Sequence, residues 1–528
     1  MSYSVDAVER AARLVRTWGA SRLRDGRTLS DALTVNGLPL WSAASPNLAA
    51  YYLPPALART SRVAQWAARA RTQASRASRR WRHRAPTLET HGCERWPAAP
   101  AALLLGFSAY MYRDVLAPVA AALTMPAVAV FDPTLEAGGT SVAVGTAADA
   151  LGRESIWRHW DARVADAAAA EQAAYTRAIA SLDYARTLPA IVRDGDQDLW
   201  PVARPLFEWL FFVYFPALLP HIAVARHLLD QHRPAIVVSA DVDDKHNRLY
   251  VELARQRGIP SLEVQFGTYG AGNVEWQFFE ADQLAVWGEQ ARDFMLTQGV
   301  PGGRIRITGS PRNDAAVRAA AAPSRAALDR LGVPATQRTV LYACVFSGLV
   351  DASRLASLDA AILAAAAADP GLTLVVKPHP GDPPGAADRF RGQPGVVIAD
   401  RGADIRELIW CCDAFLSLGS TSTMDALVAG KPVIWPDLFD VAWWDDEFKA
   451  SGATLVVKTT DALAAAFRET AAGHIAAACV PLSAARDAFL TRMVYRVDGR
   501  AAERIAALAA ELIATPPGSA GAPVESAR

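Results

Sequence analysis

The chain has 528 residues, of which 52% are apolar and 20% are charged, so it can bury more than one core and is expected to form roughly two to four globular domains. Lysine plus arginine and aspartate plus glutamate balance at 54 each, which argues against a polynucleotide partner. Five cysteines without a CxxC pattern argue against a disulfide framework or a zinc cluster and favour a reducing cytoplasm.

Residues 1–92 are predicted to form a helical extension that carries no export signal. The extension ends in an arginine-rich segment, residues 69–84, which is typical of a solvated helix face or a linker. A surface for anionic lipid or acidic glycan is the alternative interpretation of this segment. We therefore expect a cytoplasmic protein, and peripheral contact with the inner face of the membrane stays open.

Residues 93–318 alternate short apolar strands with helices, beginning with AALLLGFS, PAVAVF and TSVAVG. A long helical region over 154–232 follows. Its most apolar window, WLFFVYFPALLP from Trp209 to Pro220, contains Pro216 and is shorter than the ~20 residues of a membrane span. We expect a buried packing helix there, with an apolar face near a lipid-linked acceptor as the alternative. The strands AIVVSA, SLEVQ, QLAVWG and IRITG complete this unit.

A polar stretch over 313–337 interrupts the pattern, which then restarts with TVLYAC, LTLVVKPH, GVVIAD, AFLSLG, KPVIWP and TLVVKT. Strands and helices in alternation predict a parallel sheet covered on both faces. The predicted fold is therefore α/β, with two Rossmann-like, doubly wound domains, residues 93–318 and 319–514, that face a cleft. The last residues, 515–528, are expected to be disordered.

A lysine and a histidine follow one strand of the second unit, in the segment LVVKPHPGD. Pro378 and Pro380 fix φ on either side of His379, which suggests that the imidazole is held in one direction. Protonated, or donating through one nitrogen, His379 can bind a phosphate oxygen and stabilise charge as a phosphate leaves. Lys377 can do the same. A satisfied core histidine and a lysine that only caps the strand are the alternatives.

A hydroxyl-rich turn lies between a later strand and its helix in the same unit, and consists of Gly419, Ser420, Thr421, Ser422 and Thr423. Hydroxyls and free N–H groups at a helix N-terminus form an anion site. Asp425 lies on the first turn of the helix, where its carboxylate can accept from the hydroxyls of a ribose. Ordinary N-capping and favourable placement in the helix dipole are the alternatives. Because both strands end at one sheet edge, we expect Lys377, His379 and this turn to converge.

These segments resemble a known group of enzymes. VVKPHP, followed by SLGSTSTMDALVAGKPVI, is similar to the nucleotide-binding half of GT-B glycosyltransferases of bacterial surface polysaccharides, which include CMP-sialic acid, CMP-Kdo and CDP-glycerol transferases. GIPSLEVQFGTYG and IRITGSPRND resemble further segments of the group, so the similarity covers about 235–436. The second of these adds Gly309 and Arg312 to the implied nucleotide site. Relatives often have histidine after the position of Gln265, where this chain has Phe266.

The resemblance implies a donor nucleotide in residues 319–514, held by the residues named above, and an acceptor in residues 93–318. Ser108, Tyr110 and Arg113 follow the first strand and can contact an anionic acceptor, although a plain surface loop is the alternative. Glycosyl transfer also needs a carboxylate near the anomeric carbon. The candidates are Asp241, Asp243 and Asp244.

Asp241 is the first choice because it directly follows the strand AIVVSA. As a base it would invert the anomeric configuration, and as a nucleophile it would retain it. Asp241 and Asp243 also form a DxD pattern, which binds a metal in GT-A enzymes, but the fold context favours a reaction without metal or other cofactor.

We therefore expect a glycosyltransferase that uses a nucleotide-activated sugar, with CMP-Kdo or a related CMP-ulosonic acid preferred. The expected acceptor is an oligosaccharide or lipid-linked glycan in the assembly of lipopolysaccharide or capsule. A UDP-sugar 2-epimerase or hydrolase of the same fold and a non-catalytic assembly protein with a degenerate pocket are the alternatives.

Overall fold

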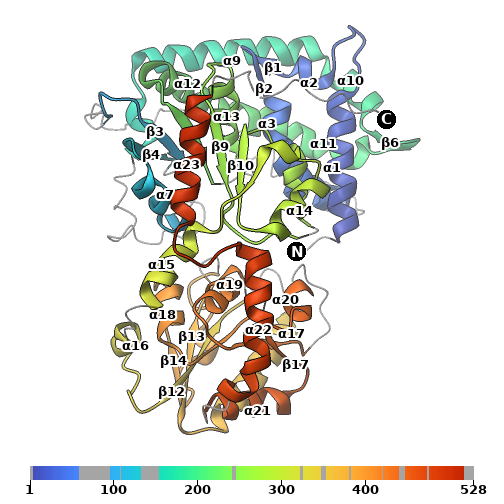
Figure 1. Ribbon diagram of the computed structural model, residues 1–528. Coiled ribbons are helices and arrows are strands. Elements are labelled where there is room, and N and C mark those ends of the chain that lie inside the picture. Colours follow the sequence, from blue (N-terminus) through green and yellow to red (C-terminus); the bar gives the residue numbers. More distant parts are fainter. Residues whose placement is uncertain are drawn as a thin grey trace.

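The computed structural model divides the chain into two lobes, one above the other in Figure 1. It describes residues 4–58, 96–106, 109–132, 154–240, 245–270, 272–320, 325–345, 352–379, 382–418, 420–438, 446–471 and 475–515. The predicted strand TSVAVG, the arginine-rich segment 69–84 and the tail beyond residue 515 lie outside these ranges.

A seven-stranded parallel sheet forms the centre of the first lobe. Its strands in spatial order are β11 (Ile305–Ile307), β10 (Gln283–Val286), β9 (Ser261–Val264), β8 (Ile236–Ser239), β3 (Ala102–Leu105), β4 (Ala127–Phe131) and β5 (Glu154–Ser155). Strands β3, β8 and β9 are buried along their whole length, as strands covered on both faces must be. The strand order reverses between β3 and β8, and open α/β sheets bind ligands beside such a reversal.

Helices cover both faces of this sheet. They are α6 (Ala109–Met111), η2 (Tyr112–Leu116), α7 (Ala117–Ala122), η4 (Ile156–His159), α9 (Ala162–Leu182), α10 (Tyr184–Ile191), α11 (Trp200–Trp209), η5 (Leu210–Tyr214), α12 (Phe215–His232), α13 (Lys245–Arg255), η6 (Val274–Phe278), α14 (Glu289–Thr297) and η7 (Gly302–Arg304). A short hairpin, β6 (Arg193–Asp194) with β7 (Gln197–Asp198), joins α10 to α11.

The N-terminal extension packs into the core of the first lobe. It contains α1 (Val5–Ala20), α2 (Leu29–Ala32), β1 (Thr34–Val35), β2 (Leu38–Pro39), α3 (Leu40–Asn47), η1 (Leu48–Tyr52) and α4 (Leu53–Leu57). Trp18 and Trp41 are both buried, and their rings lie 5.6 Å and 6.0 Å from the ring of Phe207 on α11. The described extension therefore shares one hydrophobic core with α11 and α12.

A continuous helix, Trp200–His232, contains the apolar window Trp209–Pro220. The π-helical turn η5 ends two residues before Pro216, and such a wide turn accommodates a residue that has no N–H to donate to the preceding turn. By length and composition alone this helix could cross a membrane, but 61% of its most apolar window is buried inside the protein. Its burial supports the predicted role as a packing helix.

A six-stranded parallel sheet forms the second lobe. Its strands in spatial order are β14 (Val396–Ile398), β13 (Leu372–Lys377), β12 (Arg338–Ala343), β15 (Ala414–Leu416), β16 (Val433–Pro436) and β17 (Leu455–Val457). The accompanying helices are α16 (Ala326–Arg330), α17 (Ala352–Ala367), η8 (Asp388–Phe390), α18 (Ile405–Cys411), α19 (Thr421–Val428), α20 (Asp446–Ala450) and α21 (Thr460–Ala471). The order reverses between β12 and β15. The predicted fold of two doubly wound α/β domains is confirmed.

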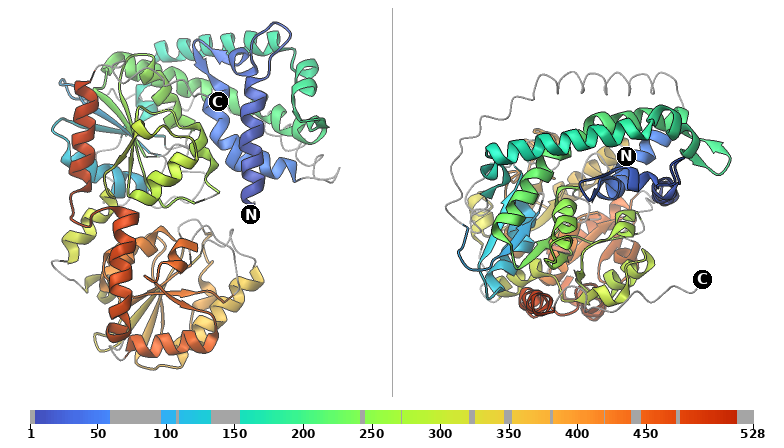
Figure 2. Two further views of the ribbon diagram at one scale, coloured as in Figure 1. Left: turned by 45° about the vertical axis from the view of Figure 1, so that its right-hand side comes forward. Right: turned by 90° about the horizontal axis from the view of Figure 1, so that it is seen from above.

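The chain crosses between the lobes twice. The first crossing leads into α15 (Pro311–Ala320), and the second joins α22 (Ile475–Val494) to α23 (Ala501–Ala514), which run along the second and first lobes respectively (Figure 2). The carboxylate of Asp314 on α15 accepts from the backbone N–H groups of Ala501 and Ala502 at 3.1 and 2.9 Å. This contact caps α23 and ties the two crossings together.

Helix α23 belongs to the core of the first lobe, although the predicted boundary assigned residues up to 514 to the second domain. Ile505 and Leu508 are buried with Leu104 of β3 and Leu116 of η2. An amphipathic C-terminal helix carries no signal in its own sequence for which of two sheets it will cover, so this return could not be foreseen from its pattern.

Candidate functional site

Two of the predicted anion-binding elements follow the same edge of the second sheet. Strand β12 pairs in parallel with β13, which ends at Lys377, and with β15, which leads into α19. The carboxyl ends of β13 and β15 are therefore separated by β12 alone, a distance of about 10 Å at ordinary strand spacing. His379 and the turn before α19 lie one strand apart, beside the reversal of strand order.

Ser420 caps helix α19. Its backbone is extended, and its hydroxyl accepts from the backbone N–H of Ser422 at 3.3 Å and lies 2.6 Å from the Ser422 hydroxyl. Thr423 is fully buried, and its backbone N–H donates to the carbonyl of Ser420 at 2.8 Å. Ser420 thus fulfils the ordinary N-cap role that was the alternative to phosphate binding. The two roles are compatible, because one hydroxyl satisfies only part of a helix N-terminus.

The N-terminus of α19 faces the first lobe. A Cβ atom placed on Gly267, in the loop after β9, would lie 3.7 Å from Oγ1 of Thr421. Gln265 holds this loop, since its amide nitrogen donates to the carbonyl of Gly267 at 2.7 Å and its amide oxygen accepts from the backbone N–H of Trp287 at 2.6 Å. The hydroxyl-rich turn therefore lies at the interface between the lobes, opposite the loop that Gln265 holds.

Lys377 and His379 differ in their surroundings. The ammonium of Lys377 is buried and donates to the carbonyls of Pro378 at 3.0 Å and Arg401 at 2.8 Å. Burial lowers the pKa of Lys377 to about 8. His379 is half-buried, and burial also lowers its pKa, against the opposing effect of Asp382. Lys377 therefore ties two loops together, while His379 is held mainly in the neutral form near pH 7.

Aromatic side chains occupy the interface side of the first lobe. The ring of Phe266 lies 6.5 Å from that of Tyr110 and 6.2 Å from that of Tyr269. Tyr110, a predicted acceptor contact, is 37% exposed. Ser108, the three acids Asp241, Asp243 and Asp244, and Gly419 lie outside the described residues, so their predicted roles stay predictions.

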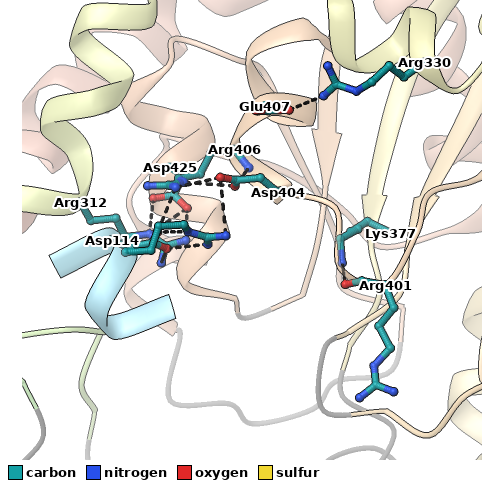
Figure 3. Close-up of polar contacts among 10 residues, drawn as sticks. Asp114, Arg312, Arg330, Lys377, Arg401, Asp404, Arg406, Glu407 and Asp425 are labelled. Atoms are coloured by element: carbon teal, nitrogen blue, oxygen red, sulfur yellow. Dashed lines mark hydrogen bonds and ion pairs between the residues drawn. The ribbon is translucent and has the colours of Figure 1, made fainter. Parts of the chain in front are cut away.

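Six charged side chains form what we call the interlobe ion network: Arg113, Asp114, Arg312, Asp404, Arg406 and Asp425 (Figure 3). Nε and Nη2 of Arg312 donate to the carboxylate of Asp425 at 2.8 and 2.5 Å, and Nη1 donates to Asp114 at 3.1 Å. Arg312, Asp114 and Asp425 are 8%, 1% and 3% exposed.

Neighbouring charges favour the ionised forms of two members of this network, Arg312 and Asp404. Burial opposes the charge on Arg312, but the carboxylates of Asp425 and Asp114 outweigh it and raise the pKa of the guanidinium. Burial likewise opposes the charge on Asp404, yet the hydrogen bond from Arg406 brings the pKa of Asp404 down to about 2. Arg312, Asp425 and Arg113 were predicted to contact ligands. In this structure Arg312 contacts Asp425 directly, and Arg113 and Arg312 both contact Asp114.

Gly309 lies beside the first crossing rather than on either sheet edge. Its φ of +86° is a conformation that glycine adopts without strain. A Cβ atom there would lie 3.0 Å from Nη2 of Arg504 on α23. Its predicted contact with a nucleotide stays a prediction. The described contacts show that α23 packs closely against Gly309, so a side chain there would be crowded.

Part of the chain matches a known protein family. Residues 299–510 match the family of CDP-glycerol:poly(glycerophosphate) glycerophosphotransferases. The match covers α15, the whole second sheet and most of α23. This match confirms the predicted resemblance to transferases of bacterial surface polymers over residues 299–510, and it indicates an enzyme that transfers a glycosyl or phosphate-linked group. No curated protein sequence matches the chain significantly.

Solved structures with a similar chain course include enzymes of two kinds. A UDP-GlcNAc 2-epimerase from Neisseria meningitidis, bound to UDP-GlcNAc, is 14% identical with a TM-score of 0.45, over 78% of this chain and 100% of that one. The wall teichoic acid polymerase TagF is 13% identical with a TM-score of 0.44, over 79% and 89% of the two chains. The fold class of this protein rests on its own two parallel sheets.

Three members of the interlobe ion network escaped the sequence analysis: Asp114, Asp404 and Arg406. In the sequence, each resembles an ordinary charged residue in or beside a helix. Their partners are distant along the chain, since Asp114 and Arg312 are 198 residues apart. The one available signal was position, because Asp114 lies shortly after strand β3 and Asp404 shortly after β14. Charges that follow parallel strands meet at the ligand-binding edge.

Among the described residues, no group of three or more histidine, cysteine, aspartate or glutamate side chains is arranged to hold a metal ion. Because Asp241, Asp243 and Asp244 lie outside the described residues, this finding does not test the DxD pattern. Metal independence stays a prediction.

Proposed function

We propose that the protein transfers an activated group from a cytidine-nucleotide donor to a growing surface polymer and releases CMP. The observation that carries the proposal is the position of the α19 N-terminus, which lies at the lobe interface opposite Gly267. A helix N-terminus favours anions through its free N–H groups and its dipole, an effect of about 0.3–1 kcal/mol before hydrogen bonds are counted.

The donor phosphate is proposed to bind Ser420, Thr421 and Ser422 at the N-terminus of α19, with His379 on the neighbouring strand end. Both elements follow the carboxyl edge of one sheet. A neutral imidazole donates one N–H, which suffices for a hydrogen bond to a phosphate oxygen that gains charge as CMP leaves. Since the ammonium of Lys377 already donates to two carbonyls, we assign it to holding the loops around His379.

Two classes of donor share this leaving group. With a CDP-linked alcohol, as in the description of the matching family, an acceptor hydroxyl attacks the phosphorus farther from cytidine, and the P–O bond to CMP breaks. With CMP-Kdo, the hydroxyl attacks the anomeric carbon, and the C–O bond to CMP breaks. In both reactions the hydroxyl loses a proton and CMP takes the electron pair. The family match favours the first donor, whereas the motifs initially favoured the second.

The acceptor is proposed to bind the first lobe beside Tyr110 and Phe266, with one of Asp241, Asp243 and Asp244 as the base. Phe266 cannot accept a proton, so the base must come from elsewhere in the interface. Tyr110 is partly exposed and lies next to Phe266, which gives an acceptor sugar or polyol an aromatic surface. Closure of the lobes would exclude water from the reacting groups.

The experiment measures CMP release from CDP-glycerol and from CMP-Kdo, with and without a polymer acceptor. Wild-type protein should release CMP from one of the two donors, and it should do so only when the acceptor is present. His379→Ala should lower the rate by roughly 10²–10³-fold, as loss of a group that stabilises developing charge does elsewhere. Its melting temperature should stay close to wild type, because the imidazole is only half-buried.

Wild-type turnover by His379→Ala would reject the assignment of His379. Conversion of UDP-GlcNAc without acceptor would favour the epimerase or hydrolase alternative instead. Absence of release from every donor, together with absence of nucleotide binding, would favour the non-catalytic alternative.

A further inference from the structure

Asp114 is the meeting point of the interlobe ion network. Its carboxylate receives Nε of Arg113 at 2.5 Å, Nη1 of Arg312 at 3.1 Å and Nη2 of Arg406 at 2.9 Å. Arg406 lies on α18 of the second lobe, and Arg312 lies on the crossing helix α15. One carboxylate of the first lobe therefore binds both the second lobe and the crossing.

The backbone around Asp114 explains how this side chain reaches the interface. Asp114 lies in the π-helical turn η2, two residues before Leu116, and Pro118 follows at the start of α7. A regular helix would pair the carbonyl of Asp114 with the N–H of residue 118, which proline lacks. A π turn, with its i→i+5 hydrogen bonds, occupies this point of the helix in place of a regular α turn. We infer that Pro118 favours the π turn, and that this turn directs the side chain of Asp114 toward the second lobe.

The network is electrically complete only when the lobes are together. It holds three arginines and three aspartates, so its formal charges cancel. Burial of an unpaired charge is strongly unfavourable, and removal of one partner leaves the others uncompensated. Separation of the lobes would take Asp114 from Arg406 and Arg113 from Asp404, and would part Arg312 from Asp114 or from Asp425. The pairing therefore selects one arrangement of the two lobes.

The network also reaches the helix that bears the proposed donor site. Arg312 holds Asp425 through a two-point contact of its planar guanidinium, and Asp425 lies one turn after Ser420, Thr421 and Ser422 on α19. Helix α15 also contacts α18, α19, α7 and η2. A displacement at Asp114 would thus be carried through Arg312 to the N-terminus of α19.

We propose that Asp114 is a positioning residue, which acts through Arg312 and Asp425 to hold the N-terminus of α19 at the reacting distance from the acceptor lobe. The effect on turnover rests on the proposed function, whereas the effect on lobe arrangement does not. In this proposal Asp425 and Arg312 hold the two lobes in alignment and do not contact the nucleotide.

The test uses the full chain with Asp114→Asn, which keeps the shape of the side chain and removes its charge. Because the donor half of the site stays intact, the affinity for CMP should stay within about twofold of wild type, while kcat for CMP release falls at least tenfold. Asp114→Glu should recover part of this loss, because it restores the charge. Equal kcat in Asp114→Asn and wild type would overturn the proposal, and so would a parallel loss of CMP affinity.

Glu503→Gln is the matched control. It removes the charge of a glutamate whose ion pair with Arg500 is more than half exposed and is not part of the network. Its kcat should equal that of wild type. If Asp114→Asn does not fold, Arg312→Lys tests the same link, because lysine keeps the charge but loses the planar contact to two carboxylates at once. An unchanged kcat in Arg312→Lys would likewise overturn the proposal.

Small-angle X-ray scattering separates this inference from the proposed function. Without any ligand, Asp114→Asn should show a larger radius of gyration than both wild type and Glu503→Gln. An identical radius of gyration in the three proteins would contradict the positioning role, whatever reaction the protein catalyses. A larger radius in a protein that releases CMP from no donor would keep the positioning role and reject the proposed function.

Discussion

Lys377 and His379 are separated by one proline, yet their environments assign them different tasks. Lys377 ends a buried strand, and its ammonium is satisfied by two backbone carbonyls. His379 is half-buried at the sheet edge where ligands bind in this fold class. Their neighbouring positions suggested a shared contact with phosphate. The different role of Lys377 depends on its hydrogen bond to the carbonyl of Arg401. Arg401 is 24 residues from Lys377 in the sequence, so the local sequence pattern cannot predict this contact.

The low pKa of Lys377 predicts a specific dependence of stability on pH. Burial lowers this pKa from the ordinary value of 10.5 to about 8. Between pH 8 and 10.5 the unfolded chain therefore holds a proton that the folded chain has released, so a rise in pH stabilises the fold. Below pH 8 the buried charge costs stability in full. Relative to Lys377→Met, wild-type protein should gain at most about 3 kcal/mol across this window.

Urea unfolding of both proteins at pH 7, 8, 9 and 10 measures this difference. The variant serves as the reference that cancels the titration of other lysines and tyrosines. A difference that stays constant over this range, or that falls with pH, would contradict the assigned burial of the ammonium.

At the scale of elements, the positions of the strands were predicted from the sequence more accurately than those of the helices. Continuous apolar runs such as those of β8 and β13 identified buried parallel strands because both faces of each strand are covered. Strand β5 has two residues and offers no such run. The helical region predicted over 154–232 consists of several helices in the structure, and the last of them, Trp200–His232, continues past Pro216 through the turn η5. A π turn depends on packing as well as on the proline.

The contact between α14 and α22 gives a prediction at this scale. A Cβ atom on Gly288, just before α14, would lie 2.3 Å from the carbonyl oxygen of Arg492 and 2.6 Å from that of Met493. Backbone atoms of α22 cannot move aside as a flexible side chain can. Gly288→Ala should therefore destabilise the protein by about 1–3 kcal/mol, as overpacking of a close contact does.

Gly267→Ala is the control for this substitution. Its Cβ atom would meet Oγ1 of Thr421 at 3.7 Å, an ordinary van der Waals distance. Its stability should match wild type within about 0.5 kcal/mol. Thermal unfolding of the two variants checks the contrast, and equal melting temperatures would contradict the close approach of α14 to α22.

At the scale of the whole molecule, the lobes are joined by covalent crossings and by charge. Helix α23 returns to the first lobe and is capped by Asp314, while the interlobe ion network binds the opposite sides of the interface. Motifs located the second lobe and the sheet edge at which we propose that the nucleotide binds. They could not locate the network, because its partners come from segments that only the assembled fold brings together.

Binding of the CMP part of the donor at α19 of the second lobe is the core of the proposed function. Its most direct test is the thermal stability of wild-type protein titrated with CMP, UMP and GMP, together with hydrogen exchange of residues 420–428. CMP at ~100 times its dissociation constant should stabilise the protein by about 2.7 kcal/mol, and should slow exchange at α19. UMP and GMP should stabilise it less. No stabilisation by CMP, or stabilisation without protection of α19, would contradict the account.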